Sequence, residues 1–118
     1  MNLLENAMTF DEFVESKAIT NNLKLERGNL FTGLDSWSMC RDDAVVVELI
    51  SEDDGQFLFF SPTKEGLSIA ESIVDFLRFR KMNRIKRVSY GDTDLIDPKL
   101  LKKIVAFAEQ AKQNILFE

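Results

Sequence analysis

The sequence predicts a small α+β domain built on one antiparallel sheet. Two apolar runs, AVVVELISE and QFLFF, flank Asp54-Gly55, a dipeptide that favours a two-residue turn between paired strands. Segments with apolar residues at helical spacing lie before and after this hairpin. We expect an antiparallel meander of four to five strands around the 44–60 hairpin, packed by two or three helices in the order α-β-β-β-β-α-β-α.

Composition limits the domain count and the partner. The 118 residues are enough for one domain (1–118), of which residues 1–8 are expected to be disordered. Apolar residues make up 45% of the chain and supply a core. Residues 1–63 hold twelve acids and four bases (net −8), whereas residues 64–118 hold eight acids and eleven bases (net +3). The first half should attract basic partners.

The first expected helix starts at a capping box, in which Thr9 is the N-cap and Glu12 its reciprocal partner. The helix runs to about Asn21, and Asn21-Asn22 can end it through a left-handed residue. Its apolar stripe consists of Phe10, Phe13, Val14, Ala18 and Ile19.

Alternating apolar and polar residues at 23–40 predict two or three short strands that join the central hairpin. The alternation is clearest at Trp37 and Met39. Turns are expected at 27–29, before the apolar pair Leu30-Phe31, and at 41–43.

A turn centred on Asp54-Gly55 pairs Ser51 with Leu58 and Leu49 with Phe60. Neither face of this hairpin is the polar face of a sheet that meets water, so one should pack on helices and the other on more protein, its own or a partner's. The first face holds Val45, Val47, Leu49, Leu58 and Phe60, and the second holds Val46, Ile50, Phe57 and Phe59.

Three more elements follow the hairpin. Ser68-Ile69-Ala70-Glu71 is a second capping box, which predicts a helix to about Met82. Residues 84–90 form one more expected strand. Asp97 then caps a last amphipathic helix with Pro98 at its first position, which is a favoured arrangement.

Missing residue types argue against an enzyme. The chain has no histidine, which removes His-based acid–base catalysis, and its single cysteine removes CxxC chemistry. The five glycines are scattered and form no phosphate loop. We therefore expect no catalytic residue, cofactor or metal site. The lone cysteine and the lack of an export signal or a membrane span predict a cytoplasmic protein.

Six bases within ten residues form a basic stretch with two interpretations. It can be a phosphate-contacting stripe, which would bind anions or nucleic acid. The alternative is a solvated helix end followed by an edge strand guarded by charge. The stretch consists of Arg78, Arg80, Lys81, Arg84, Lys86 and Arg87.

Two other features have ordinary explanations. Asp92, Asp94 and Asp97 resemble a cation-binding loop, but the EF-hand pattern fails because Leu95-Ile96 occupy ligand positions. Asp97 is already explained as an N-cap. Cys40 has no nearby base to activate it, so we treat it as a small hydrophobic residue.

These observations favour an acidic binding module that neutralises a basic partner by blocking its site, in the manner of an immunity protein or antitoxin-like inhibitor of a bacterial toxin. In such an inhibitor, rim carboxylates steer the partner and buried aromatics supply most of the affinity. The expected surface consists of Glu48, Glu52, Asp53, Asp54, Phe57 and Phe59.

Two alternatives stay open. The small size, low pI, alternation of helices and strands and amphipathic last helix resemble secretion-type chaperones, which hold a client segment and are typically dimers. However, residues 84–97 are too short for the extra strand pair that these chaperones carry. The other alternative is a regulatory module that binds nucleic acid through the basic stretch. We expect a monomer or a homodimer.

Overall fold

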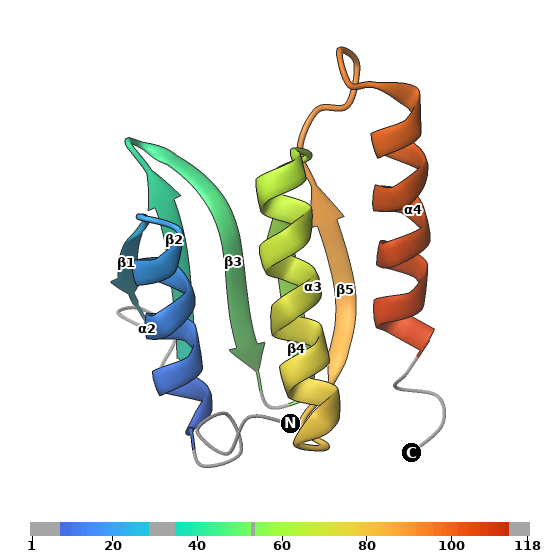
Figure 1. Cartoon of the computed structure of the whole chain (residues 1–118). Helices are drawn as coiled ribbons and strands as arrows, with labels where there is room; N and C mark the ends of the chain where they lie inside the picture. The colour runs from blue at the N-terminus through green and yellow to red at the C-terminus, as the bar shows by residue number, and fades with distance from the viewer. Residues whose placement is uncertain (1–7, 29–34, 53, 114–118) are drawn as a thin grey trace.

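A computed structural model describes residues 8–28, 35–52 and 54–113 of the chain (Figure 1). The described residues form one five-stranded sheet and three helices, which confirms the predicted α+β class and element order. In chain order, the elements are α2 (Phe10–Thr20), β1 (Lys24–Arg27), β2 (Asp35–Arg41), β3 (Ala44–Glu52), β4 (Gly55–Phe60), α3 (Lys64–Phe79), β5 (Ile85–Tyr90) and α4 (Pro98–Gln113).

The sheet is mixed. Strands β1 to β4 form the expected antiparallel meander, with the strand order β1-β2-β3-β4-β5. Strand β5 pairs in parallel with β4, because α3 carries the chain back to the other end of the sheet. β5 is therefore an edge strand.

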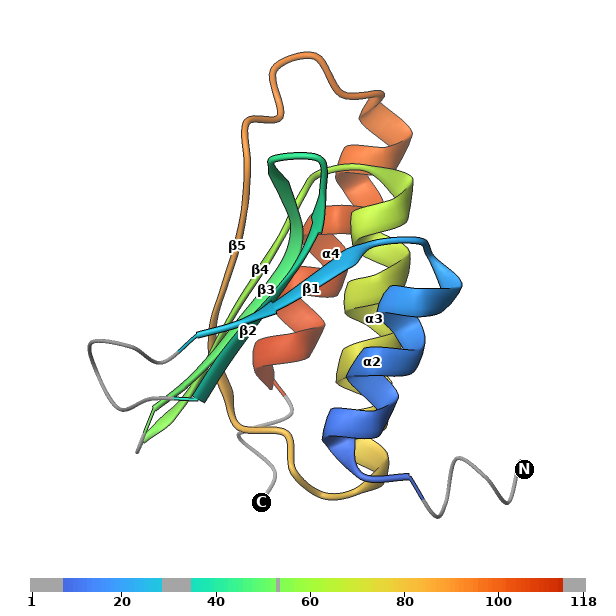
Figure 2. The same ribbon diagram turned by 90° about the vertical axis from the view of Figure 1, so that its left-hand side faces the viewer.

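All three helices pack on the same face of the sheet, as Figure 2 shows in side view. The sheet contributes Met39, Leu49, Leu58 and Phe60 to the core between the layers, each 1% exposed or less. The helices contribute Val14, Ile73, Leu77 and Ile104, which are completely buried. None of the described helices has the length and apolarity that crossing a bilayer requires.

The capping box of α2 forms as predicted. The Glu12 backbone N–H donates to Thr9 Oγ1 at 3.1 Å, and the Thr9 N–H donates to Glu12 Oε1 at 2.8 Å. Asn22 adopts the predicted left-handed conformation after the helix, with φ of 57°. Met8, the last residue of the segment expected to be disordered, packs on the core, and residues 1–7 of that segment lie outside the described part.

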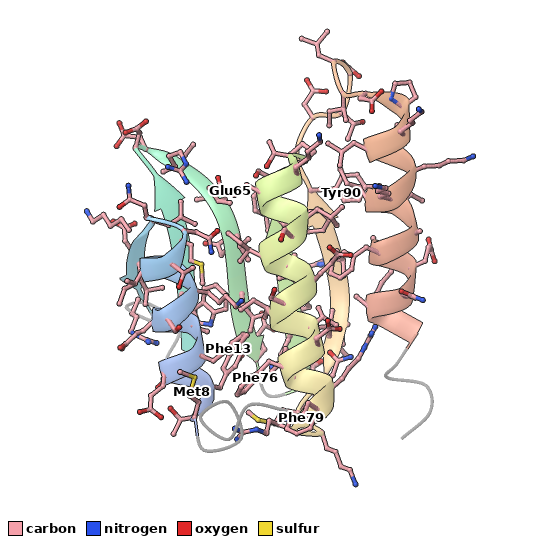
Figure 3. All side chains as sticks on the ribbon, viewed as in Figure 1. Met8, Phe13, Glu65, Phe76, Phe79 and Tyr90 are labelled. Atoms are coloured by element: carbon pink, nitrogen blue, oxygen red, sulfur yellow. The ribbon has the colours of Figure 1, made fainter. Side chains whose placement is uncertain are left out.

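Aromatic contacts hold α2 against α3. The rings of Phe13 and Phe76 stack with their centroids 4.2 Å apart, and Figure 3 shows both side chains between the two helices. Phe10 extends this cluster from Phe76 to Trp37 on β2, with centroid distances of 5.9 and 6.2 Å.

Helix α3 begins five residues earlier than predicted. Its N-cap is Thr63, whose Oγ1 accepts a hydrogen bond from the Gly66 N–H at 3.0 Å. Ser68 lies inside the helix instead, because the chain must turn from β4 onto the sheet directly after Pro62. The helix ends at Phe79, and Lys81 follows with φ of 57°, so the predicted end at Met82 is three residues late.

The register of the central hairpin differs from the prediction by two residues. Glu52 pairs with Gly55 and Leu49 with Leu58, so the connection consists of residues 53 and 54. Gly55 therefore belongs to β4. A Cβ atom on Gly55 would lie 2.5 Å from side-chain carbons of Lys86, so the glycine is explained by the close approach of β5.

Because a shift of two residues preserves the faces of a strand, most of the predicted face assignment holds. The exception is Val45 and Val46, at a β-bulge between β2 and β3. Met39 pairs with Val47, but Cys40 pairs with Val45, so Val46 is the extra residue. Val46 joins the buried core, and Val45 is half-buried.

The predicted elements of residues 23–43 are found in part. Strands β1 and β2 form, and the turn at Asp42 has φ of 56°. The predicted turn at 27–29 lies only partly within the described residues, and Leu30-Phe31 lies outside them.

Replacing Gly66 with alanine tests the packing of the α3 N-terminus. Alanine normally favours a helix over glycine, but a Cβ atom here would overlap the Ser61 carbonyl oxygen. We expect Gly66→Ala to lower the free energy of unfolding by about 1–3 kcal/mol, measured by urea denaturation. Ser68→Ala, at an exposed position of the same helix, is the control and should change it by less than about 0.5 kcal/mol. Equal or greater stability of the Gly66 variant would contradict this packing.

Candidate functional site

The face of the sheet opposite the helices is the candidate site, and we call it the open face. No described helix covers it (Figure 2). Cross-strand partners share a face of a sheet, so the pairing of β1 to β5 assigns its members. The open face contains Lys24, Glu26, Ser36, Ser38, Cys40, Val45, Glu48, Ile50, Glu52, Phe57, Phe59, Arg87 and Ser89.

One row of the open face is apolar at its centre. Ile50 pairs with Phe57, and both side chains are half-buried. Phe57 pairs in turn with Arg87 of β5, and the Arg87 guanidinium lies 4.5 Å from the centroid of the Phe57 ring. This cation–π contact covers part of the ring and keeps a positive charge beside the apolar strip.

The next row places a carboxylate beside the second aromatic ring. Glu48 pairs with Phe59 on one side and with Ser38 on the other. The Ser38 hydroxyl donates to Glu48 Oε2 at 3.1 Å, which holds this half-buried carboxylate in place. Glu26 pairs with Ser38 and ends the row at the β1 edge.

The hairpin tip adds another carboxylate, but part of its negative charge is neutralised. Glu52 is half-buried on the open face. Asp54 accepts a hydrogen bond from Lys86 Nζ at 2.7 Å, and this bond together with the positive charge lowers the pKa of Asp54. Asp53, the remaining predicted residue, lies outside the described part of the chain.

The residues of the basic stretch lie in several different surroundings. At the end of α3, Arg78 donates to the Gln110 carbonyl oxygen, and Arg80 lies over the Phe76 ring. Lys86 pairs with Asp54 and Arg87 with Phe57. This arrangement matches the alternative interpretation, in which a helix end precedes an edge strand guarded by charge.

The two remaining members of the stretch lie between α3 and β5. Lys81 is exposed in the left-handed turn after α3, and the exposed Arg84 precedes β5. The Arg84 backbone pairs with Gln56: its N–H donates to Gln56 Oε1, and its carbonyl accepts from the Gln56 N–H.

Cys40 is buried in the open face. Burial, followed by the negative charge of Glu26, raises the pKa of its thiol, so the reactive thiolate is disfavoured. In the loop before α4, the Asp94 N–H donates to Asp92 Oδ1 at 3.0 Å. Among the described residues, no three His, Cys, Asp or Glu side chains gather in a group that would hold a metal ion.

Sequence reasoning missed that Arg87 and Phe57 belong to one surface. It treated Arg87 as part of a linear basic stretch, whereas the parallel crossover places β5 beside β4. The available signal was the charged, short strand after an amphipathic helix, which is typical of an edge strand.

The Asp54–Lys86 ion pair gives a pH-dependent prediction. Lys86→Met removes the positive charge but keeps most of the side-chain stem, so we expect the pKa of Asp54 to rise toward that of an ordinary aspartate. Because folding lowers this pKa, the pair stabilises the fold above the unfolded-state pKa, and this contribution is lost as the pH falls through the folded-state pKa. An NMR titration of the Asp54 carboxyl carbon measures the change, with Lys102→Met on α4 as the control. An unchanged pKa in the Lys86 variant would be evidence against the pair.

Comparison of the chain with protein families, with curated proteins and with solved structures finds no match.

Proposed function

We propose that this chain is a binding protein rather than an enzyme, and that it blocks a basic partner protein through the open face. The observation that carries the proposal is the position of Ile50, Phe57 and Phe59. These three apolar side chains lie on the face of the sheet that no described helix covers. Apolar groups gathered on a sheet face, with polar groups around them, are typical of a protein-docking surface.

The charges around the apolar strip favour a basic partner. Glu26, Glu48 and Glu52 lie on the same face. Two cations lie there among the described residues: Lys24, whose Nζ is 3.4 Å from Glu26 Oε2, and Arg87 on β5, so the carboxylates are in excess by one (three against two). Carboxylates at the rim steer a cationic partner and orient it, while the aromatic centre supplies most of the affinity. The Ser38–Glu48 hydrogen bond fixes one carboxylate before binding, which lowers the entropic cost of association.

The concrete form of the proposal is an immunity or antitoxin-like inhibitor of a bacterial toxin, acting in the cytoplasm. A blocking mechanism needs only shape, apolar area and charge, which fits a chain without histidine. The free thiol of Cys40 fits a reducing compartment. Nucleic-acid binding has less support, because the residues of the basic stretch lie in several different surroundings and do not form one stripe.

Affinity capture from a lysate of the native host tests the proposal. We expect the wild-type protein to retain a basic protein, and the double variant Phe57→Ser, Phe59→Ser to lose most of it, at least about tenfold. Val105→Ser is the matched control, because Val105 is an apolar residue on α4 that is 42% exposed and lies on the helix side. Circular dichroism of each variant verifies that it is folded.

The contribution of charge to binding is tested separately, in a variant that keeps the apolar residues of the open face. Glu52→Lys should slow the association rate with the captured partner, and the effect should shrink at high salt. Glu109→Lys on α4 is the matched charge reversal and should leave the rate unchanged. The proposal fails if the partner is acidic, or if capture survives the open-face variants and not the α4 variants.

A further inference from the structure

A second surface lies on the opposite side of the molecule, between α3 and α4. A cleft of about 670 Å³ separates the two helices. This volume falls within the range of about 300–1,000 Å³ that is usual for ligand clefts. Its floor is apolar: Leu67 and Phe107 are buried, and the Phe107 ring packs edge-to-face on Phe60 with centroids 5.4 Å apart. The half-buried Leu100 continues the floor along α4.

Lysines surround this apolar floor. Lys64 comes from α3, and Lys99 and Lys103 come from α4. All three are exposed, and within the described residues none of them forms an ion pair. The lining also includes two carboxylates, Glu71 and Asp97, so the cleft has one excess positive charge. A partner with negative charge on its rim would complement it.

The shape of the cleft favours a helical partner. On α4 the lining residues Lys99, Lys103, Ala106 and Gln110 form one stripe, which extends about 16 Å at about 1.5 Å per residue. At the far end, Arg78 Nη2 of α3 donates to the Gln110 carbonyl oxygen at 3.2 Å and joins the two helices. The result is an elongated groove, the geometry in which an amphipathic helix places its apolar face.

Both helices point the same way along this groove. Figure 1 shows that α3 and α4 start at the same end of the molecule. Their N-terminal dipole ends, Lys64 and Lys99 therefore lie together at that end. A bound helix that runs antiparallel to both would place its negative C-terminal end there.

We propose that the α3–α4 groove binds an acidic amphipathic helix of a partner protein, with the apolar residues of that helix on Leu67, Leu100 and Phe107. Its carboxylates face Lys64, Lys99 and Lys103, and it runs antiparallel to α3 and α4. The site is separate from the open face and does not depend on the function proposed for that face.

The test uses a fluorescein-labelled peptide of about 16 residues, with Leu on one helical face and Glu on the other, and measures fluorescence anisotropy. Two matched peptides replace every Glu with Lys, or keep the composition and scramble the Leu stripe. We expect the acidic amphipathic peptide to bind at least about tenfold more tightly than either.

Variants of the full chain locate the binding. Lys99→Glu with Lys103→Glu should weaken binding at least about tenfold, and so should Ala106→Glu, which places a carboxylate in the groove at an exposed position. Lys112→Glu is the control on the same helix, outside the groove, and should leave the affinity within about twofold. The open-face variant Phe57→Ser should also bind normally.

Three outcomes would overturn the proposal. The first is equal binding of the acidic and scrambled peptides, and the second is binding that survives both groove variants. The third concerns inorganic phosphate alone: if it shifts the NMR signals of the groove lysines and competes fully with the peptide at millimolar concentration, the groove is an anion site and not a helix site. The direction of the bound helix is tested with a peptide that carries its label at the C-terminus. The label should contact the end of the groove formed by Lys64 and Lys99. Contacts only at the Gln110 end would mean that the helix runs in the opposite direction.

Discussion

The β3–β4 pair constrains the rest of the structure because it is apolar on both faces. One face, with Leu49, Leu58 and Phe60, is buried under the helices. All three described helices lie on that side, since the crossover through α3 returns the chain over the same face before β5 is added. The other face therefore keeps Phe57 and Phe59 without a helical cover. Because this hairpin is apolar on both faces, it supplies residues both to the core and to the open face.

Positive charge is concentrated on one helix and not on the whole helix layer, because α2 has three acids and one base and α3 has three acids and two bases. The acidic first half supplies β1 to β4, and most of the open face comes from it. Helix α4 carries Lys99, Lys102, Lys103 and Lys112 against Glu109, a net charge of +3. The open face and α4 thus attract partners of opposite charge, and a single partner of uniform charge would not be expected to bind both.

The sequence predicts those features that local chemistry determines. The Thr9–Glu12 capping box follows from neighbouring residues and forms. The predicted apolar stripe of α2 also forms except at Ile19, which is 79% exposed, so its predicted place on the stripe is wrong. The wrong predictions concern features that contacts between distant segments of the chain determine. Gly55 is a strand residue because Lys86 approaches it, and Val46 turns into the core at a bulge that pairing with β2 creates. The contact between Phe57 and Arg87 could not be foreseen for the same reason.

The magnitude of apolar burial decides how large the interface on the open face must be. Fully burying a large apolar side chain contributes about 1.5–3 kcal/mol, but Ile50, Phe57 and Phe59 are already half-buried. Docking on these three alone therefore gains only a few kcal/mol, whereas association costs about 4–15 kcal/mol of lost freedom. A stable complex needs about 800 Å² per partner, which requires contact across the strands from Glu26 to Arg87. The partner must then pair with both Glu48 and Arg87. A uniformly basic surface would place like charge against Arg87. The open face therefore favours a basic surface that also offers a hydrogen-bond acceptor near β5.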